Sequence, residues 1–157
     1  MWEKFPLFRG INAVNLDSKG RMSIPTRYRC ALEKAKNQVI VTIDTEDPCL
    51  LLYPLPEWEV LEKKIEGLPS YNKAARRVQR LLIGHATELE LDLNGRILLP
   101  SILRDYAHVD KQVILVGQGK KFEIWADSLW EKGRQDWISR TTQIDKEFPT
   151  ELLDLSI

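Results

Sequence analysis

The chain has 157 residues, of which 43% are hydrophobic and 29% are charged, as in a typical globular protein. Lysine and arginine together number 23, and so do aspartate and glutamate, so the formal net charge is zero. This balance argues against a protein that coats nucleic acid along its whole length. No apolar stretch reaches the roughly 18 residues of a membrane-spanning helix, and the first residues lack the pattern of a signal peptide. We therefore expect a cytoplasmic protein without membrane contact.

The charges are distributed unevenly along the chain. Residues 9–36 hold seven basic and two acidic side chains, whereas residues 44–66 hold two basic and seven acidic ones. A strong local field can therefore exist although the total charge cancels.

The first predicted elements surround a turn with the sequence Asp-Ser-Lys-Gly-Arg, which begins at Asp17 and lies between predicted strands at residues 13–16 and 21–24. An aspartate in the first position of a turn can accept hydrogen bonds from backbone N–H groups with its own carboxylate. Gly20 can take the left-handed conformation that a bulge at this place requires. Pro25 follows the second strand, and proline is favoured in the first turn of a helix, so a short helix is predicted to begin there.

That short helix has one apolar face at i, i+3, i+4, i+7 spacing: Tyr28, Ala31, Leu32 and Ala35. Strands at residues 38–42 and 49–53 complete the first unit. Two helices, over residues 56–66 and 72–83, are predicted to follow.

Residues 91–104 repeat residues 16–29 at an offset of 75. Six of the 14 aligned positions are identical, where average residue usage gives about one: Leu16/Leu91, Asp17/Asp92, Gly20/Gly95, Arg21/Arg96, Pro25/Pro100 and Arg29/Arg104. A repeat of this kind sets the architecture. The second unit is therefore predicted to contain the same elements in the same order, and a further helix over residues 127–139 follows it.

Each repeated unit has about 45 residues, too few to bury a sizeable core alone. The two units are therefore predicted to pack together as a pseudo-dimer within one chain, which gives an α+β fold with connecting helices. The predicted boundaries are residues 11–58 for the first unit, 59–86 for a helical connector, 87–130 for the second unit, and 131–157 for a C-terminal helix and an acidic tail.

The sequence contains no motif of nucleophilic, phosphate-binding or metal-dependent catalysis. His85 follows a glycine at the predicted end of a helix, where a structural role is favoured, and His108 has no cysteine or histidine near it to share a metal. Cys30 and Cys49 lack the spacing of a zinc-ligand pair or of a disulfide framework. We therefore predict no enzymatic activity, no cofactor and no metal site.

The first turn carries two cations, Lys19 and Arg21, at a place where a turn pushes its residues out of a sheet. Lysine delivers a point charge to phosphate, and the arginine fork can grip phosphate or the edge of guanine. Arg27 and Arg29, on the adjoining helix, could hold the DNA backbone. The structural alternative is that Arg21 only pairs with Asp17 across the turn, and an exposed pair of this kind is worth at most about 1 kcal/mol.

The second turn is less basic than the first. Lys19 is replaced by Asn94 and Arg27 by Ile102, whereas Arg96 keeps the arginine of the motif. DNA contact is therefore predicted mainly for the first copy.

A further basic set lies on the predicted helix at residues 72–83: Lys73, Arg76, Arg77 and Arg80. Their spacing places them on one helix face. The preferred interpretation is a solvated face that pairs with the acidic residues of 57–66, rather than a second DNA contact.

The segment Phe8-Arg9-Gly10 and the motifs at Asp17–Arg21 and Asp92–Arg96 resemble the MraZ family, as do residues 49–58 and 76–86. The resemblance covers nearly the whole chain from its eighth residue onward. The seven residues before it precede the usual start of family members, either as an extension without function or as a start assigned too early.

The resemblance implies two AbrB-like swapped-hairpin units in each chain and a ring-shaped homo-oligomer. It implies a nucleoid-associated transcriptional regulator of the bacterial division and cell-wall gene cluster, which binds double-stranded DNA at short tandem repeats upstream of its own gene. The candidate DNA-binding residues, taken together, are Arg21, Lys19, Arg27, Arg29, Arg96, Arg9 and Asn94. The candidate structural residues of the turns are Asp17, Gly20, Asp92 and Gly95. One alternative stays open, an antitoxin-like interaction module whose acidic tail wraps a protein partner.

Overall fold

The computed structural model describes residues 7–140 and residue 155. The chain divides into two compact units, Met1–Asp127 and Ser128–Ile157. The first contains both copies of the repeat, and the second contains nearly all of helix α5 (Asp127–Arg140). Most of the N-terminal extension and nearly all of the acidic tail lie outside the described residues. No helix in the described part combines the length and the apolarity needed to cross a membrane.

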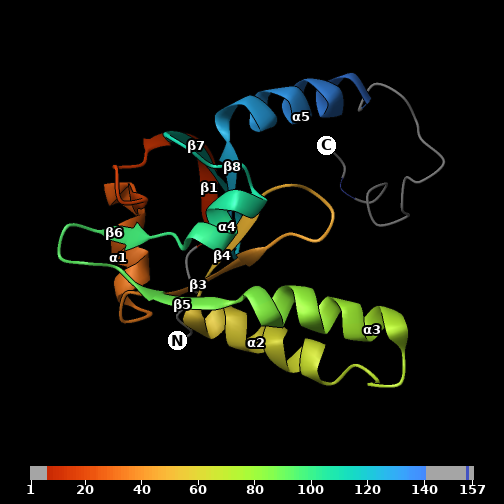
Figure 1. Ribbon diagram of the computed structural model, residues 1–157. Coiled ribbons are helices and arrows are strands. Elements are labelled where there is room, and N and C mark those ends of the chain that lie inside the picture. Colours follow the sequence, from red (N-terminus) through yellow and green to blue (C-terminus); the bar gives the residue numbers. More distant parts are fainter. Residues whose placement is uncertain (1–6, 141–154, 156–157) are drawn as a thin grey trace. The chain divides into compact units, whose positions relative to one another are not determined.

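Both copies contain the same elements in the same order (Figure 1). Those of the first copy are β1 (Phe8–Asn15), β2 (Arg21–Ser23), α1 (Thr26–Glu33), β3 (Gln38–Ile43) and β4 (Leu50–Pro54). The connector consists of α2 (Leu55–Glu66), α3 (Lys73–Val78) and the π-helical segment η1 (Gln79–Ile83). Those of the second copy are β5 (Thr87–Glu90), β6 (Arg96–Leu98), α4 (Ser101–Tyr106), β7 (Gln112–Gly119) and β8 (Phe122–Ala126). The α+β class and the tandem repeat predicted from the sequence are confirmed.

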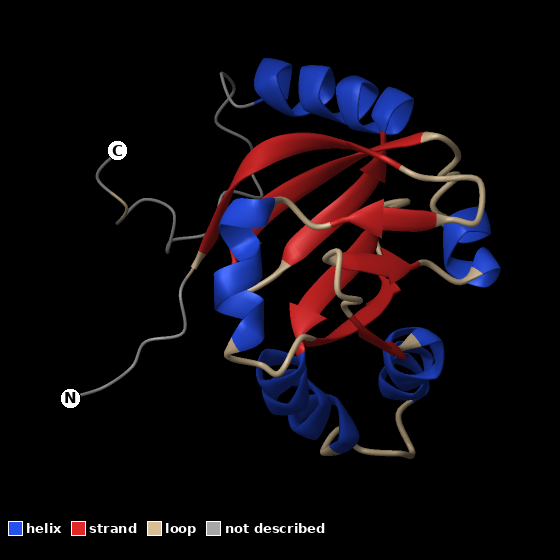
Figure 2. Cartoon of the chain, turned by 90° about the vertical axis from the view of Figure 1, so that its left-hand side faces the viewer, coloured by secondary structure: helices blue, strands red, loops and turns tan. Residues whose placement is uncertain are grey.

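The strands form two antiparallel sheets, which lie at the centre of the first unit with its helices outside them (Figure 2). One sheet has six strands in the order β1-β7-β8-β4-β3-β5, and the other is the two-stranded ribbon β2-β6. The first strand of each copy pairs with the third strand of the other, β1 with β7 and β5 with β3. Neither copy therefore completes a sheet from its own strands.

The turns do not lead into long hairpins. Across the first turn only Leu16 and Met22 pair, after which β1 follows β7 and β2 follows β6. The strand predicted at residues 13–16 is accordingly longer at its start, because β7 offers partners from Gln112 to Gly119. A partner in the other copy leaves no trace in local periodicity, which is why the longer strand was not predicted.

One hydrophobic core joins the two copies. The predicted face of α1 is confirmed, with Tyr28 and Leu32 buried and packed into this core. Phe122 of β8 is fully buried, and its ring centroid lies 4.3 Å from that of Phe8 and 4.8 Å from that of Tyr28. Because Phe8 and Tyr28 belong to the first copy and Phe122 to the second, this cluster fastens the copies to each other.

The helix predicted at residues 72–83 has the expected extent, but its second half is π-helical. Asn72 caps it by accepting hydrogen bonds from two backbone N–H groups of its first turn. Side chains satisfy two carbonyls of the wide turn, with Thr42 Oγ1 donating to the Leu82 carbonyl at 2.7 Å and His85 Nδ1 donating to the Leu81 carbonyl at 2.8 Å. His85 thus has the structural role that its position at a helix end indicated.

Candidate nucleic acid interface

The first Asp-x-x-Gly-Arg turn is held by its own aspartate. The Asp17 carboxylate accepts hydrogen bonds from the backbone N–H groups of Lys19 and Arg21, both at 2.9 Å. The Asp17 carbonyl accepts a third from the N–H of Gly20 at 3.0 Å. Gly20 has a φ of +89°, a conformation that side-chain-bearing residues rarely adopt. The sequence Asp-x-x-Gly therefore fixes the backbone that presents Lys19 and Arg21.

The second turn repeats these contacts. The Asp92 carboxylate accepts from the backbone N–H groups of Asn94 at 2.8 Å and of Arg96 at 2.9 Å. Gly95 has a φ of +71°. The side chain of Asn94 is exposed, as is that of Lys19 at the matching place.

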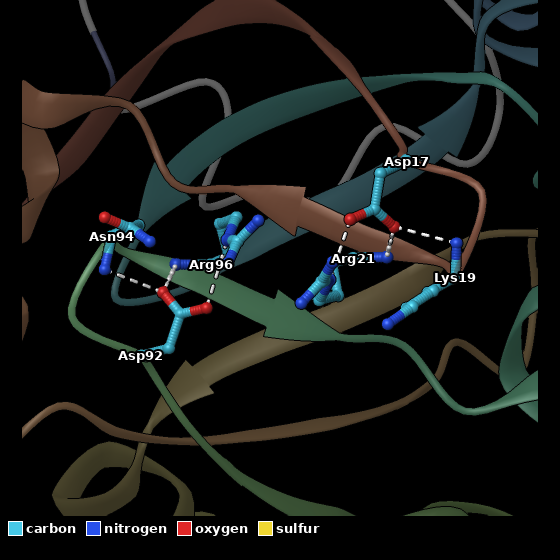
Figure 3. A network of polar contacts seen from close by, with 6 residues as sticks. All are labelled: Asp17, Lys19, Arg21, Asp92, Asn94 and Arg96. Atoms are coloured by element: carbon cyan, nitrogen blue, oxygen red, sulfur yellow. Dashed lines mark hydrogen bonds and ion pairs between the residues drawn. The ribbon is translucent and has the colours of Figure 1, made fainter.

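Each motif arginine forms an ion pair with the aspartate four residues before it (Figure 3). Arg21 Nε lies 2.7 Å from Asp17 Oδ2, and Arg96 Nε lies 3.0 Å from Asp92 Oδ2. The structural alternative for Arg21 thus describes a real contact. The Nη groups of both arginines make no hydrogen bond with the described residues, so the ion pair orients the fork and leaves its end available for a ligand.

The two turns sit at opposite ends of the β2-β6 ribbon (Figure 3). Arg21 pairs with Leu98, and Ser23 pairs with Arg96. Directly opposed residues share a face of the sheet, and residues two apart along a strand do so too. Arg21 and Arg96 therefore lie on one outer face, while the pair between them, Met22 and Ile97, is buried beneath it.

Arg27 and Arg9 lie apart from the turns. Arg27 Nη2 donates to Asn12 Oδ1 and, at 2.6 Å, to the hydroxyl of Tyr28, whose ring the guanidinium also covers. That hydroxyl in turn donates to the carbonyl of Arg9. The Arg27 side chain thus belongs to a cluster along β1, to which Arg9 contributes its backbone carbonyl.

Arg29 lies against the second turn rather than the first. A Cβ added to Gly95 would lie only 2.2 Å from Arg29 Nε. Arg104, its repeat partner, lies in the same way against Gly20, where an added Cβ would be 2.8 Å from the guanidinium carbon. Arg104 was not singled out from the sequence, although its identity with Arg29 in the repeat was a signal for it.

The basic set on α3 and η1 is exposed, as predicted for a solvated face, but its predicted pairing with α2 is wrong. In the part of the chain that the structure describes, none of its four members forms an ion pair, and together with Leu81 they line a cavity of 390 Å³: Lys73, Arg76, Arg77 and Arg80. The side facing α2 carries Gln79, whose amide donates to the Ile65 carbonyl at 3.1 Å. The neutral residue thus takes the contact with α2, and the charges face away.

Three ligand-type side chains converge at Asp44, Cys49 and Glu123, where their ligand atoms all lie within 4.8 Å of one another. Burial raises the pKa of the Cys49 thiol strongly, and the charges of Glu123 and Asp44 raise it further. Burial also raises the pKa of Glu123. The Cys49 thiol donates to Asp44 at 3.7 Å, so it acts as a protonated donor within the protein.

Protonation of Asp17 is expected to loosen the first turn only in strong acid. The hydrogen bond from the backbone N–H of Arg21 is the main cause that lowers the pKa of Asp17 to about 2 from its usual 3.8. Since the folded-state pKa lies below the unfolded one, the stabilising effect of this carboxylate is complete above pH 3.8 and is lost as the pH falls through about 2. NMR titration of the Asp17 carboxyl carbon should give a midpoint near pH 2, and a midpoint near 3.8 would show that the carboxylate does not hold the turn.

Comparison with known proteins identifies the same repeat. A family model described as "MraZ protein, putative antitoxin-like" matches residues 7–81 and again residues 82–148. Proteins named "Transcriptional regulator MraZ" are similar over 96% of this chain and 100% of their own length. Those of Coxiella burnetii (strain RSA 493 / Nine Mile phase I), Legionella pneumophila (strain Corby) and Halorhodospira halophila (strain DSM 244 / SL1) are 54%, 51% and 50% identical to it. The chain belongs to the MraZ family.

Proposed function

We propose that this protein is a sequence-specific DNA-binding transcriptional regulator, and that the outer face of the β2-β6 ribbon is its DNA-contacting surface. The observation that carries the proposal is the common outward face of Arg21 and Arg96, each with its aspartate bound at Nε and its Nη groups unbonded to the described residues. Relatives at 50–54% identity that are named transcriptional regulators support it.

The first turn is proposed to make the stronger contact. Arg21 offers a planar fork to a phosphate or to a guanine edge, and the exposed Lys19 adds a point charge beside it. At the second turn Arg96 retains the fork, but Asn94 supplies no charge. Arg29, Arg27 and the other cations named from the sequence are proposed to contribute only to the electrostatic field around this surface.

We propose further that the two copies, which contain β1 to β4 and β5 to β8, form a pseudo-dimer of AbrB-like swapped-hairpin units. The pairing of β1 with β7, of β5 with β3 and of β2 with β6 supports this arrangement, because each pair joins one copy to the other. The connector between the two units is α2, α3 and η1, and α5 follows the second unit.

A ring-shaped homo-oligomer is proposed to supply the affinity that one chain lacks. A turn with one lysine and one arginine makes few contacts, and linking several weak contacts can raise avidity by about 10²–10⁴. The fitting ligand is double-stranded DNA with short tandem repeats. We propose the protein's own promoter and the division and cell-wall gene cluster as targets, and the cytoplasm and nucleoid as its location.

Binding to DNA from immediately upstream of the gene is expected to weaken linearly with the logarithm of the salt concentration. Each phosphate neutralised by a lysine or an arginine contributes a slope of about −0.9, so several engaged turns should give a steep dependence. Fluorescence anisotropy with a labelled duplex between 50 and 300 mM salt, concentrations chosen as roughly those that bracket the physiological range, measures it. A flat response would contradict the proposal.

The family description "antitoxin-like" favours one second candidate, a module that binds a protein partner. In that case the acidic C-terminal tail would be the binding segment. Affinity purification that yields one partner protein in a fixed ratio, without retained DNA, would favour this function over the first.

A further inference from the structure

Each turn is contacted by a backbone N–H group and by an arginine side chain from the other copy. At the first turn, the Gly20 carbonyl accepts a hydrogen bond from the Leu99 N–H at 3.0 Å. The Leu99 carbonyl accepts one from Arg104 Nε at the same distance. The Arg104 side chain then lies on Gly20 itself, in the space that a side chain there would fill. Two residues of the second copy thus contact the glycine of the first copy, Leu99 at its carbonyl and Arg104 at the place of its missing side chain.

The second turn is contacted in the same way by the first copy. The Gly95 carbonyl accepts from the Ile24 N–H at 2.8 Å, and the Ile24 carbonyl accepts from Arg29 Nε at 2.8 Å. The Arg29 side chain lies on Gly95. Neither arginine forms an ion pair with a described residue, so both act here through shape and through Nε.

We propose that Arg104 is a positioning residue for the DNA-contacting turn Asp17–Arg21, and that Arg29 has the same role for the turn Asp92–Arg96. The inference rests on the proposed function for its effect on DNA. Gly20 lies between Lys19 and Arg21, so a guanidinium packed on it limits the movement of both cations. A positioned cation binds DNA more tightly than a free one because less conformational freedom is lost on binding.

Position in the sequence suggests that Arg29 matters more for DNA binding than Arg104, and the structure indicates the reverse order. Arg29 lies in the more basic copy, next to Arg27, yet it supports the less basic turn. Arg104 lies in the copy with the less basic turn, yet it supports the turn that carries Lys19 and Arg21. Loss of Arg104 should therefore impair DNA binding more than loss of Arg29.

A direct phosphate contact by Arg104 would also weaken binding when the residue is lost, and the salt dependence separates the two roles. A residue that neutralises a phosphate contributes about 0.9 to the slope, whereas a positioning residue contributes nothing. Arg104→Gln and Arg29→Gln, compared in the full-length protein, form a matched pair. Arg104→Lys keeps the charge but lacks the planar fork.

The experiment combines DNA affinity, salt slope and amide hydrogen exchange. Arg104→Gln is expected to lower affinity about tenfold, a loss comparable to that of one hydrogen bond with its packing, with an unchanged slope. Arg29→Gln should lower it less than about twofold. In Arg104→Gln the backbone N–H groups of Lys19 and Arg21 should exchange faster, and in Arg29→Gln those of Asn94 and Arg96 should do so instead.

The exchange measurement needs no DNA, so it tests the positioning role even if the proposed function fails in the affinity assay. Unchanged exchange at Lys19 and Arg21 in Arg104→Gln would overturn the inference. A slope reduced by about 0.9 would overturn it too, because Arg104 would then be a phosphate ligand. If Arg104→Gln does not fold, Arg104→Lys gives the same test, and wild-type affinity and exchange in that variant would count against the role.

Discussion

Replacement of Arg21 by glutamine is expected to lower the affinity for operator DNA between about fivefold and 150-fold for each turn engaged. This range corresponds to the roughly 1–3 kcal/mol that a two-pronged arginine contact provides. The turn itself should survive, because the Asp17 carboxylate also accepts hydrogen bonds from the backbone N–H groups of residues 19 and 21, which the substitution leaves in place. Competition binding with a labelled duplex measures the loss.

The matched control is Arg96→Gln, which removes the same ion pair at the less basic turn and should cost less affinity. Size-exclusion chromatography with light scattering should give one and the same oligomer for wild type and both variants. A smaller assembly in Arg21→Gln would show that Arg21 is structural and would end its assignment to DNA.

Truncation of Phe122 to alanine should lower the free energy of unfolding by about 3–5 kcal/mol, the usual cost of removing a buried aromatic ring. The ring is fully buried and contacts the rings of Phe8 and Tyr28. Because these partners belong to the other copy, the cavity would weaken the packing between the copies as well as within one. Urea denaturation followed by tryptophan fluorescence measures the change.

A surface substitution provides the comparison for this core variant. Leu98 is 51% exposed on the ribbon, so Leu98→Ala should stay within about 0.5 kcal/mol of wild type. Both variants should unfold in a single transition as long as the copies share one core. Two separate transitions in the wild type would contradict the shared core.

Local patterns predicted most of the elements. The apolar spacing in α1 identified the side that carries Tyr28 and Leu32, and Pro25 marked the place where that helix begins. The repeat then transferred the same elements to the second copy. These features depend on residues that are only a few positions apart, so a short stretch of sequence is enough to predict them.

The pairings between the copies were not predictable in this way. β1 begins five residues earlier than its alternation indicates because its partner is β7, about 100 residues away in the chain. Arg27 was assigned to DNA from its position beside the turn, but its guanidinium reaches Asn12 and the ring of Tyr28. A long side chain can serve several neighbours, and only the tertiary structure decides among them.

The predicted pairing of the basic set on α3 and η1 with α2 was wrong for a related reason. Opposite net charges on adjacent helices favoured pairing, but Gln79 makes the contact with α2, and Arg76 and Arg80 are exposed without an ion pair to a described residue. Charge counts along a sequence predict a field, and they do not predict which face of a helix meets its neighbour.

The exchange of glycine and arginine between the copies also constrains how this chain can evolve. Gly20 and Gly95 give room to the arginines of the opposite copy. A substitution of either glycine, or of either arginine, therefore disturbs a turn or a helix in the other half. After a gene duplication, such reciprocity prevents either half from drifting freely at these positions. The turn tips escape this constraint, and there the halves have already diverged, with Lys19 in one and Asn94 in the other. Under the proposed function, the two halves can therefore differ in their DNA contacts while each keeps the turn of the other in shape.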